Sequence, residues 1–468
     1  MISTLWLSLN MKKAYLIFIL VFTYSFTISA CNFRSSGEIP TEPLTEVPIL
    51  LTTTGDSQTI ASEASIIPTP TKESSRPTLE DPTLILVYTS SGNVWLWKLN
   101  EKRQLTFSGD AYSPRISSDG QVVAFLRPVD AFHQEIWAIN TDGSNLRKLV
   151  STTDLDTVAG GFLEPNALGV IPYHFDWIPD THTLAFNSQQ VLNGPGLSLL
   201  DDLNLVDAEN PKVIPLLLSG WGGEFVYSPD GNQIAITTPD SIILCKADGS
   251  NYQEVLTYEP VNTYSEYRYY ANPIWSSDGT YLQVAIPPKD PLEIPVKSTM
   301  LWMIPANGSP PTKMGELTPV PFFEEPVKFS PDMSHLAYLK EAGLPAENRR
   351  ELHISSSDSS GDFVYTTQAL LHFLDWSFDS TRIAFITGED QEAWTGTLES
   401  SPVQLSPESR GVVGLRWVDS RNFLYIQQKA DGFNLLIGDS DGNSLLVDSI
   451  PVGKGVVSLF PVYDFSYP

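Results

Sequence analysis

From residue 82 onward, short runs of alternating apolar and polar residues recur along the chain. One copy reads YSPDGNQIAI (Tyr227–Ile236): an aromatic strand end, a turn of Ser, Pro, Asp and Gly, and then an apolar strand. Proline presets φ at the second position of such a turn, aspartate accepts backbone N–H bonds, and glycine supplies φ > 0. The pattern therefore predicts two antiparallel strands joined by a tight turn.

Seven copies of this pattern align on the turn aspartate, at spacings of 61, 50, 48, 54, 47 and 40 residues: Asp119, Asp180, Asp230, Asp278, Asp332, Asp379 and Asp419. Most copies carry a second hairpin around Asp-Gly or Asn-Gly, as in SIILCKADGSNYQEVL. Each unit therefore predicts four antiparallel strands, a to d, which is typical of a propeller blade. No segment keeps a 3.6-residue period, so we expect almost no helix.

The two ends of the repeat region complement each other. The segment from Leu84 to Thr106 predicts strands b, c and d without a strand a, and VYDFSYP (462–468) predicts a lone strand a. Joined, they form one further blade, which protects sheet edges that would otherwise be open. The sequence thus predicts an all-β fold, a β-propeller of four-stranded antiparallel blades closed by the N- and C-terminal strands. We expect eight blades, with seven as the alternative because the last unit spans only 40 residues.

These repeats resemble the TolB-type (WD-type) β-propeller repeat, which also occurs in prolyl-oligopeptidase-like enzymes. The resemblance covers nearly all of 84–468. It implies a propeller fold and suggests an envelope-associated interaction. Two departures weaken any transfer of function: the N-terminal domain that accompanies the TolB propeller is replaced by unrelated sequence, and no segment of these 468 residues remains for a hydrolase domain.

The N-terminal segment predicts export. Lys12 and Lys13 precede an apolar run from Ala14 to about Phe22, which is typical of a signal peptide and too short for a stable membrane span. Translation starts at Met1 or at Met11. Ile28-Ser29-Ala30-Cys31 resembles the bacterial lipobox, which implies that Cys31 is diacylated and begins the mature protein. The alternative is an ordinary signal peptide followed by a chance cysteine.

The domain boundaries follow from these signals. We expect a signal peptide over 1–30, the lipidated Cys31 with a disordered Ser/Thr/Pro-rich tether over 31–81, and the propeller over 82–468. Two acyl chains suffice for stable anchoring. The protein is therefore predicted to be exported and membrane-anchored through Cys31, facing the cell exterior or the periplasm.

The charge balance excludes one class of partner. The chain carries 55 acidic and 28 basic residues, a formal net charge of -27. Phosphate backbones repel such a polyanion, so nucleic-acid binding is disfavoured. Cys245, the only other cysteine, lies in a predicted strand and is expected to be a small buried apolar residue.

Candidate chemistry is sparse. Seven similar aspartates spread around a ring cannot serve one active site, so we expect them to make turns. Gly438-Asp439-Ser440-Asp441-Gly442 satisfies G-x-S-x-G, but it is predicted to be a hairpin in an all-β repeat rather than a nucleophile elbow. The six histidines show no metal-binding spacing. No catalytic residue, metal or cofactor is predicted. The aromatic residues before the turns are expected to pack between blades: Trp177, Tyr227, Trp275, Phe329, Trp376 and Trp417.

Topology indicates where binding would occur. In an antiparallel blade the a–b and c–d turns lie at one end, and the longer b–c and d–a connections lie at the other. Variable loops on a rigid ring are the usual place for recognition. The segment 258–272 is the richest in tyrosine and arginine, which are common at interfaces. The candidate binding face comprises Tyr264, Tyr267, Arg268, Tyr269, Tyr270, Phe132, His133, Arg349 and Arg350; the alternative is that this loop only packs on its neighbour.

Three functions remain open at this point. The leading hypothesis is a non-catalytic module that recognises an envelope or extracellular protein, peptide or glycan. The second is an enzyme that acts on a glycan or peptide at a site in the central channel, which would need converging carboxylates or a metal near the axis. The third is a structural or assembly factor of the envelope.

Overall fold

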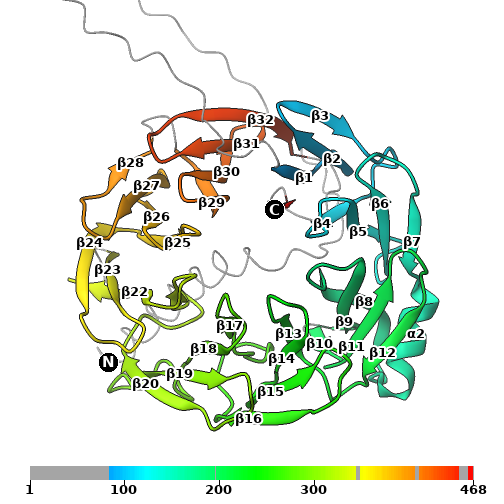
Figure 1. Ribbon diagram of the computed structural model, residues 1–468, viewed down its shortest axis with the longest axis horizontal. Helices are drawn as coiled ribbons and strands as arrows, with labels where there is room; N and C mark the ends of the chain where they lie inside the picture. Colours follow the sequence, from blue (N-terminus) through cyan, green and yellow to red (C-terminus); the bar gives the residue numbers. More distant parts are fainter. Residues whose placement is uncertain (1–83, 195–196, 344–347, 406–409, 453–461, 467–468) are drawn as a thin grey trace, which may run out of the picture.

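The computed structural model describes residues 84–194, 197–343, 348–405, 410–452 and 462–466. The predicted signal peptide, Cys31 and the tether lie outside the described residues. Eight antiparallel sheets are arranged radially as an eight-bladed β-propeller (Figure 1). The predicted fold class is therefore confirmed, and the alternative of seven blades is wrong.

Blade 1 is the composite blade. Its strands are β1 (Ile85–Ser90), β2 (Asn93–Lys98), β3 (Glu101–Gln104) and β33 (Tyr463–Ser466). Strand β33 pairs with β1, with Ile85 opposite Ser466 and Tyr88 opposite Tyr463. The last described strand thus fills the innermost position that the start of the repeat region leaves empty.

The other blades follow in chain order, each numbered from its innermost strand outward. Blade 2 contains β4 (Tyr112–Ile116), β5 (Val122–Pro128), β6 (Gln134–Asn140) and β7 (Arg147–Val150). Blade 3 contains β8 (Ala167–Trp177), β9 (Thr183–Leu192), β11 (Leu203–Asp207) and β12 (Val213–Leu217), with a short extra strand, β10 (Leu197–Leu199), beside β9. Blade 4 contains β13 (Glu224–Tyr227), β14 (Gln233–Thr237), β15 (Ser241–Lys246) and β16 (Gln253–Thr257).

The second half of the ring repeats the same order. Blade 5 contains β17 (Ile274–Trp275), β18 (Tyr281–Ile286), β19 (Thr299–Pro305) and β20 (Thr312–Leu317). Blade 6 contains β21 (Lys328–Phe329), β22 (His335–Ala342), β23 (Arg349–Ser356) and β24 (Phe363–Ala369). Blade 7 contains β25 (His372–Trp376), β26 (Arg382–Thr387), β27 (Glu392–Thr397) and β28 (Val403–Gln404). Blade 8 contains β29 (Val412–Trp417), β30 (Asn422–Lys429), β31 (Gly432–Asp439) and β32 (Ser444–Pro451).

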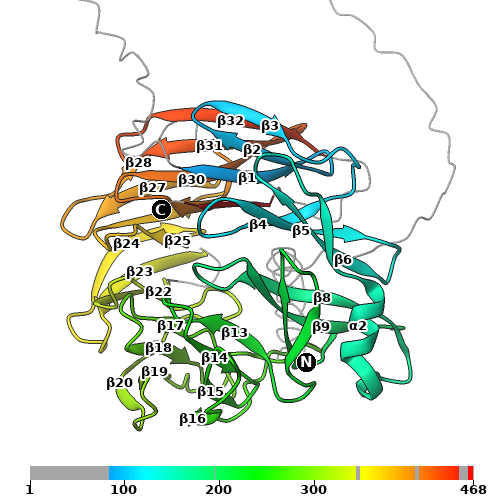
Figure 2. The ribbon, with the colours of Figure 1, turned by 45° about the vertical axis from the view of Figure 1, so that its right-hand side comes forward.

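Helix is confined to one connection in the described part of the chain. The α-helix α2 (Thr152–Ala159) and the 3₁₀ helix η1 (Gly160–Phe162) lie between blades 2 and 3, at the outer rim of the ring (Figures 1 and 2). Ser151 caps α2, because its hydroxyl accepts the N–H of Asp154 while the Asp154 carboxylate accepts the N–H of Ser151. No helix among the described residues is long and apolar enough to span a membrane.

The core is divided into eight apolar clusters, one at each boundary between consecutive blades. Both faces of an inner strand are buried, which explains its continuous apolar sequence. In β14, Ile234 and Ile236 pack against blade 3, whereas Ala235 between them packs against blade 5. The cluster between blades 8 and 1 contains Tyr88, Leu435 and Tyr463, so the ring is closed by a packed core.

Candidate functional site

The topology places all b–c and d–a connections on one face, which we call the loop face, and all a–b and c–d turns on the other, the turn face. Phe132 and His133 lie in the b–c connection between β5 and β6. The loop 258–273 connects β16 to β17, and Arg349 begins β23 directly after a b–c connection. All the predicted binding residues therefore belong to the loop face.

Within the loop 258–273, Tyr269 packs inward. Its ring lies 4.8 Å from the ring of Phe322 and 6.2 Å from that of Tyr258, both in edge-to-face geometry. Burial raises the pKa of the Tyr269 hydroxyl far above its usual value. Tyr269 therefore mainly packs against the neighbouring blade, as the alternative from the sequence expected, and presents little surface to a ligand.

Arg268 and Tyr270 are both held by one carboxylate, that of Asp201. The Tyr270 hydroxyl donates a 2.6 Å bond to Asp201 Oδ1, and Arg268 Nη2 lies 3.0 Å from Asp201 Oδ2. Asp201 belongs to the connection between β10 and β11 of blade 3. The loop is thus fixed to blade 3, and the Arg268 side chain remains 49% exposed.

The other predicted residues are also partly engaged within the protein. The Tyr264 hydroxyl bonds to Asp290, and His133 Nδ1 lies 2.8 Å from Asp130 Oδ1. Arg350 pairs with Glu324 and Glu341 and keeps only 15% of its side chain exposed. Arg349 Nη2 donates a hydrogen bond to the carbonyl of Thr367. Phe132 and Tyr264 are the two exposed aromatic residues of the predicted set.

A hollow of about 800 Å³ opens beside the loop 258–273, at the inner strands of blades 3 to 7; we call it the axial hollow. Its aromatic lining includes Tyr173, Tyr267, Tyr270, Phe322 and Phe323. Of the predicted face, Tyr267, Arg268, Tyr269 and Tyr270 line this hollow. The other five do not: Tyr264, Phe132, His133, Arg349 and Arg350. The sequence repeats gave no sign of Phe322 and Phe323, because they precede the copy at Asp332.

Three carboxylates line the axial hollow: Glu224, Glu325 and Asp375. Glu224 Oε2 lies 3.2 Å from His174 Nδ1, and Glu325 Oε2 lies 3.1 Å from His372 Nδ1. Burial raises the pKa of Asp375 above its usual value, although Lys328 and the N–H groups of Trp417 and Trp376 partly offset this. The hollow therefore combines aromatic surface with carboxylates, two of them paired with histidine.

A belt of alternating charge surrounds the axis, and we call it the axial belt. On the innermost strand of each blade it is the residue immediately before the aromatic residue that precedes the a–b turn. In blades 2 and 1 the corresponding position precedes Ile116 and Phe465. From blade 6 round to blade 3 the belt residues are Lys328, Asp375, Arg416, Asp464, Arg115 and Asp176; blades 4 and 5 carry Val226 and Ile274. The alternation was visible in the aligned copies but was not recognised from the sequence. Val226, Ile274, Lys328 and Asp375 line the axial hollow, so the belt contributes two apolar and two charged residues there.

Contacts between blades accompany the belt. Arg416 Nη1 lies 3.3 Å from Asp464 Oδ1, and Asp464 Oδ2 accepts a 3.0 Å bond from the N–H of Ile116 in blade 2. Asp176 faces the axis and is accessible there, but surrounding protein raises the pKa of its carboxyl, with Arg115 partly offsetting the effect. The last strand is thereby bonded to both of its neighbours in the ring.

The seven turn aspartates all lie in a–b turns on the turn face. Six of them accept the N–H of the residue two positions later, at 2.7 to 3.2 Å: Asp119, Asp230, Asp278, Asp332, Asp379 and Asp419. Asp180 differs, because it takes φ of 57° itself and its N–H donates to Ser118 of blade 2. These contacts give the aspartates a role in turn geometry.

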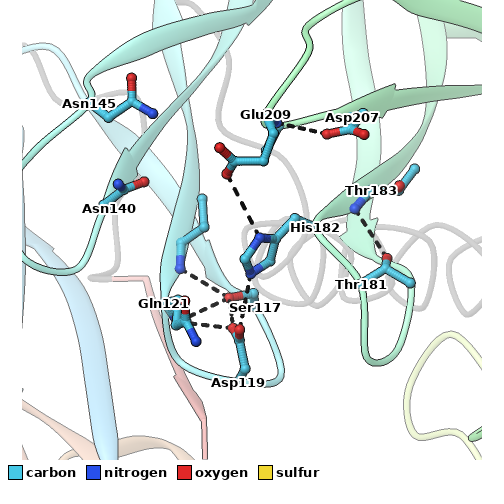
Figure 3. Close-up of polar contacts among 12 residues, drawn as sticks. Ser117, Asp119, Gln121, Asn140, Asn145, Thr181, His182, Thr183, Asp207 and Glu209 are labelled. Carbon is cyan, nitrogen blue, oxygen red and sulfur yellow. Dashed lines mark hydrogen bonds and ion pairs between the residues drawn. The ribbon is translucent and has the colours of Figure 1, made fainter.

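One turn aspartate also joins two blades (Figure 3). His182 Nε2 of blade 3 lies 3.0 Å from Asp119 Oδ2 of blade 2, and its Nδ1 lies 3.8 Å from Glu209 Oε1. Burial alone would raise the pKa of Asp119, but hydrogen bonds from Ser117, Gln121 and His182 outweigh it and lower the pKa below its usual value. This contact ties the turn faces of the two blades together.

The other sequence motifs show no reactive arrangement. Ser440 lies in the turn between β31 and β32, where Asp439 accepts the N–H groups of Asp441 and Asn443. Cys245 is buried, and burial raises the pKa of its thiol to about 11. Among the described residues no group of three or more His, Cys, Asp and Glu side chains is arranged to hold a metal ion.

Comparisons with known proteins find similar structures but no related sequence. No protein-family model and no curated protein matches the chain. Among solved structures, TolB from Acinetobacter baumannii is 15% identical with a TM-score of 0.32, covering 59% of this chain and 61% of that one. Dipeptidyl peptidase 4 from Porphyromonas gingivalis is 13% identical with a TM-score of 0.49, covering 72% and 53%. An oligogalacturonate lyase from Vibrio parahaemolyticus is 11% identical with a TM-score of 0.42, covering 69% and 90%. The chain thus spans about three fifths of TolB and about half of the peptidase.

Proposed function

We propose that this chain is an exported, lipid-anchored protein whose propeller recognises a peptide segment of an envelope or extracellular protein on its loop face, without catalysis. The axial hollow is the observation that carries this proposal. Its volume, about 800 Å³, lies within the range of ligand sites, and aromatic side chains supply much of its lining.

Preorganisation supports binding at this place. Asp201 fixes Arg268 and Tyr270, and Tyr269 is locked against Phe322. Side chains that are already ordered lose little conformational entropy when a ligand arrives. Rigid tyrosines and an arginine around a hollow are the residue types that dominate binding energy at interfaces.

A capture experiment tests the proposal. The full-length protein, solubilised in detergent, is incubated with envelope extract, and bound proteins are compared between the natural chain and Tyr173→Ala/Phe323→Ala, two changes in the axial hollow. Phe378→Ala is the matched control, because Phe378 is a 77% exposed aromatic residue on the turn face. We expect the hollow variant to lose a specific partner that the control retains. Equal recovery by all three proteins would contradict recognition at the axial hollow.

The anchor has its own test. We expect Cys31→Ser to release the protein from the membrane fraction, because a serine at this position cannot be acylated through sulfur. Radiolabelled fatty acid should be incorporated into the natural chain and not into the variant. Continued fractionation of the variant with membranes would contradict the lipid anchor.

The carboxylates of the axial hollow favour a second candidate, an enzyme that acts on a glycan or peptide. Glu224, Glu325 and Asp375 line one hollow, and a carboxyl with a raised pKa, such as Asp375, suits a general acid. Mass spectrometry of a captured partner decides between the two. A partner recovered unchanged supports recognition, and a partner that is cleaved by the natural chain but not by Glu224→Gln or Asp375→Asn supports catalysis.

A further inference from the structure

A second hollow, of about 870 Å³, lies on the other side of the loop 258–273, against the outer strands of blade 4; we call it the rim hollow. It is lined by Trp221 from the connection between blades 3 and 4, Tyr252 and Glu254 near the outermost strand β16, Asp240 from a b–c connection, and Glu266 from the loop 258–273. None of these five residues belongs to the predicted binding face, but Tyr267, Arg268 and Tyr269 of that face line both hollows.

Trp221 is unusual among the tryptophans of this protein. Its side chain is 61% exposed, and it is the only exposed one of the ten tryptophans that the structure describes. The indole lies edge-to-face with the ring of Tyr252, with centroids 6.1 Å apart, and the Tyr252 hydroxyl donates a 2.9 Å bond to the Trp221 carbonyl. Two aromatic rings therefore form one wall of the hollow.

The turn that carries Trp221 is rigid. The N–H of Trp221 bonds to the carbonyl of Leu218, the N–H of Gly220 to that of Leu200, and the N–H of Gly222 to that of Asp201. A Cβ on Gly222 would lie 2.4 Å from the backbone carbon of Asp202, so the turn packs directly on the blade 3 backbone. Trp221 is thus held at the surface by a fixed backbone.

The charge of the rim hollow is strongly one-sided. Four carboxylates line it, those of Asp201, Asp240, Glu254 and Glu266, against a single guanidinium, that of Arg268. Arg268 is already paired with Asp201 at 3.0 Å. Within the described part of the chain, no ion pair joins Asp240, Glu254 or Glu266 to a cation. Three carboxylates therefore face the hollow without a cationic partner.

We propose that the rim hollow binds lysine or arginine side chains of a basic peptide segment, with the cation over the face of Trp221 and within reach of Glu254 and Glu266. An exposed tryptophan is the best aromatic partner for a cation, and neighbouring carboxylates add attraction that salt screens. This inference rests on the proposed function, since it names the chemistry of the segment that the loop face recognises.

Binding of a defined peptide tests the proposal. The probe is a fluorescein-labelled peptide of alternating glycine and lysine with three lysines, titrated with the full-length protein in detergent and followed by fluorescence anisotropy. The same peptide with glutamate in place of lysine is the negative probe. We expect the lysine peptide to bind, and its affinity to fall at 500 mM NaCl. We expect the glutamate peptide not to bind.

Variants locate the site and identify the interaction. Glu254→Gln/Glu266→Gln should weaken lysine-peptide binding about tenfold or more. The control, Glu101→Gln/Glu399→Gln, removes the same charge from two exposed glutamates elsewhere and should change binding less than about twofold. If the lysine makes a cation–π contact with residue 221, the affinity for the peptide should be highest with tryptophan, lower with phenylalanine and lowest with leucine. We expect Trp221→Leu to bind the peptide about tenfold more weakly than the natural chain. Trp221 is exposed, so these variants should keep the natural thermal unfolding midpoint.

Three results would overturn the inference: no binding of the lysine peptide, equal losses in the hollow and control pairs, or indifference to the residue at position 221. The proposed function would survive any of them if Tyr173→Ala/Phe323→Ala still lost its captured partner, because those two residues line the axial hollow and not the rim hollow. Conversely, lysine-peptide binding with no captured partner would support the rim hollow alone.

Discussion

The indole N–H of Trp376 donates a 3.1 Å hydrogen bond to the backbone carbonyl of Lys328, on the innermost strand of the preceding blade. Trp177 and Trp275 make the same bond to the carbonyls of Arg115 and Val226. The fourth tryptophan of the series, Trp417, is buried, and its Nε1 has no hydrogen-bond partner among the described residues. The repeat therefore contains both a bonded and an unbonded version of one contact between blades.

This difference predicts that replacing Trp376 and replacing Trp417 have unequal effects on stability. We expect Trp376→Phe to lower the free energy of unfolding by about 2–4 kcal/mol, because it removes both a buried hydrogen bond and part of a packed ring. Trp417→Phe should lower the free energy of unfolding by about 1–2 kcal/mol less than Trp376→Phe does, since it removes a buried N–H that has no partner. Urea denaturation of the two variants measures this, and equal losses would contradict the assigned role of the bond.

The pairing of β33 with β1 predicts the effect of removing the end of the chain. We expect deletion of residues 463–468 to destabilise the protein by more than about 4 kcal/mol, because β1 loses its partner and the apolar cluster between blades 8 and 1 loses Tyr463 and Phe465. A synthetic peptide of these residues should restore part of the thermal midpoint by adding a strand to β1. A scrambled peptide is the control, and a truncated protein as stable as the natural one would disprove closure by β33.

The turn aspartates predict a loss of stability in acid. Hydrogen bonds from Ser228 and Asn232 lower the pKa of Asp230, and those from Ser276 and Thr280 lower the pKa of Asp278. A carboxyl with a depressed folded-state pKa stabilises the fold above its unfolded pKa of about 3.9, and this contribution is lost as the pH falls through the folded-state pKa. Thermal midpoints between pH 6 and pH 2.5 should therefore fall less steeply for Asp230→Asn/Asp278→Asn than for the natural chain; identical slopes would contradict this.

The belt aspartates predict the opposite sign. Burial raises the pKa of Asp375 in the folded state, so its contribution is fully present below the unfolded pKa and is lost as the pH rises through the folded-state pKa. Asp375→Asn retains an oxygen that can accept a bond from a tryptophan N–H. We expect it to leave the stability at pH 7 within about 1 kcal/mol of the natural value or to raise it. A large loss at pH 7 would show that the ionised carboxylate is needed by Lys328 or Arg416.

The close packing of Gly222 predicts a local effect on the rim hollow. We expect Gly222→Ala to cost about 1–3 kcal/mol, because its Cβ would displace the turn from the Asp202 backbone, and to weaken lysine-peptide binding by moving Trp221. Gly161→Ala is the matched control, since its Cβ would meet no atom within 4 Å. Unchanged peptide binding by Gly222→Ala would mean that the rigid turn is not needed.

The fold could be predicted because its signals are local. Each a–b turn is encoded within about six residues around its aspartate, and seven repetitions make the period visible. Even so, the copy at Asp180 lacks both the serine and the glycine, and the turn there is made by positive φ at the aspartate itself. The extra strand β10 follows no repeat and was not predicted.

The candidate site was predicted less well, because its contacts join distant segments. The sequence around Arg268 and Tyr270 does not indicate that both side chains bond to Asp201, which lies 67 and 69 positions earlier in the chain. Trp221 lies between repeats, so no alignment of copies singles it out. The alternating charges of the axial belt, by contrast, were present in the aligned copies, and comparing the residue before each turn aromatic would have found them.

Placing the innermost strand of blade 1 at residues 463–466 also constrains how the protein is made. Those residues leave the ribosome after every other described strand, so β1 has no permanent neighbour on its inner edge until they emerge. The circle can close only after residues 463–466 have emerged, in a step that brings together the most widely separated of the described strands. Such late, long-range pairing is slow and leaves apolar surface unprotected in the meantime. The nascent chain should therefore depend on a holding chaperone until residues 463–466 emerge.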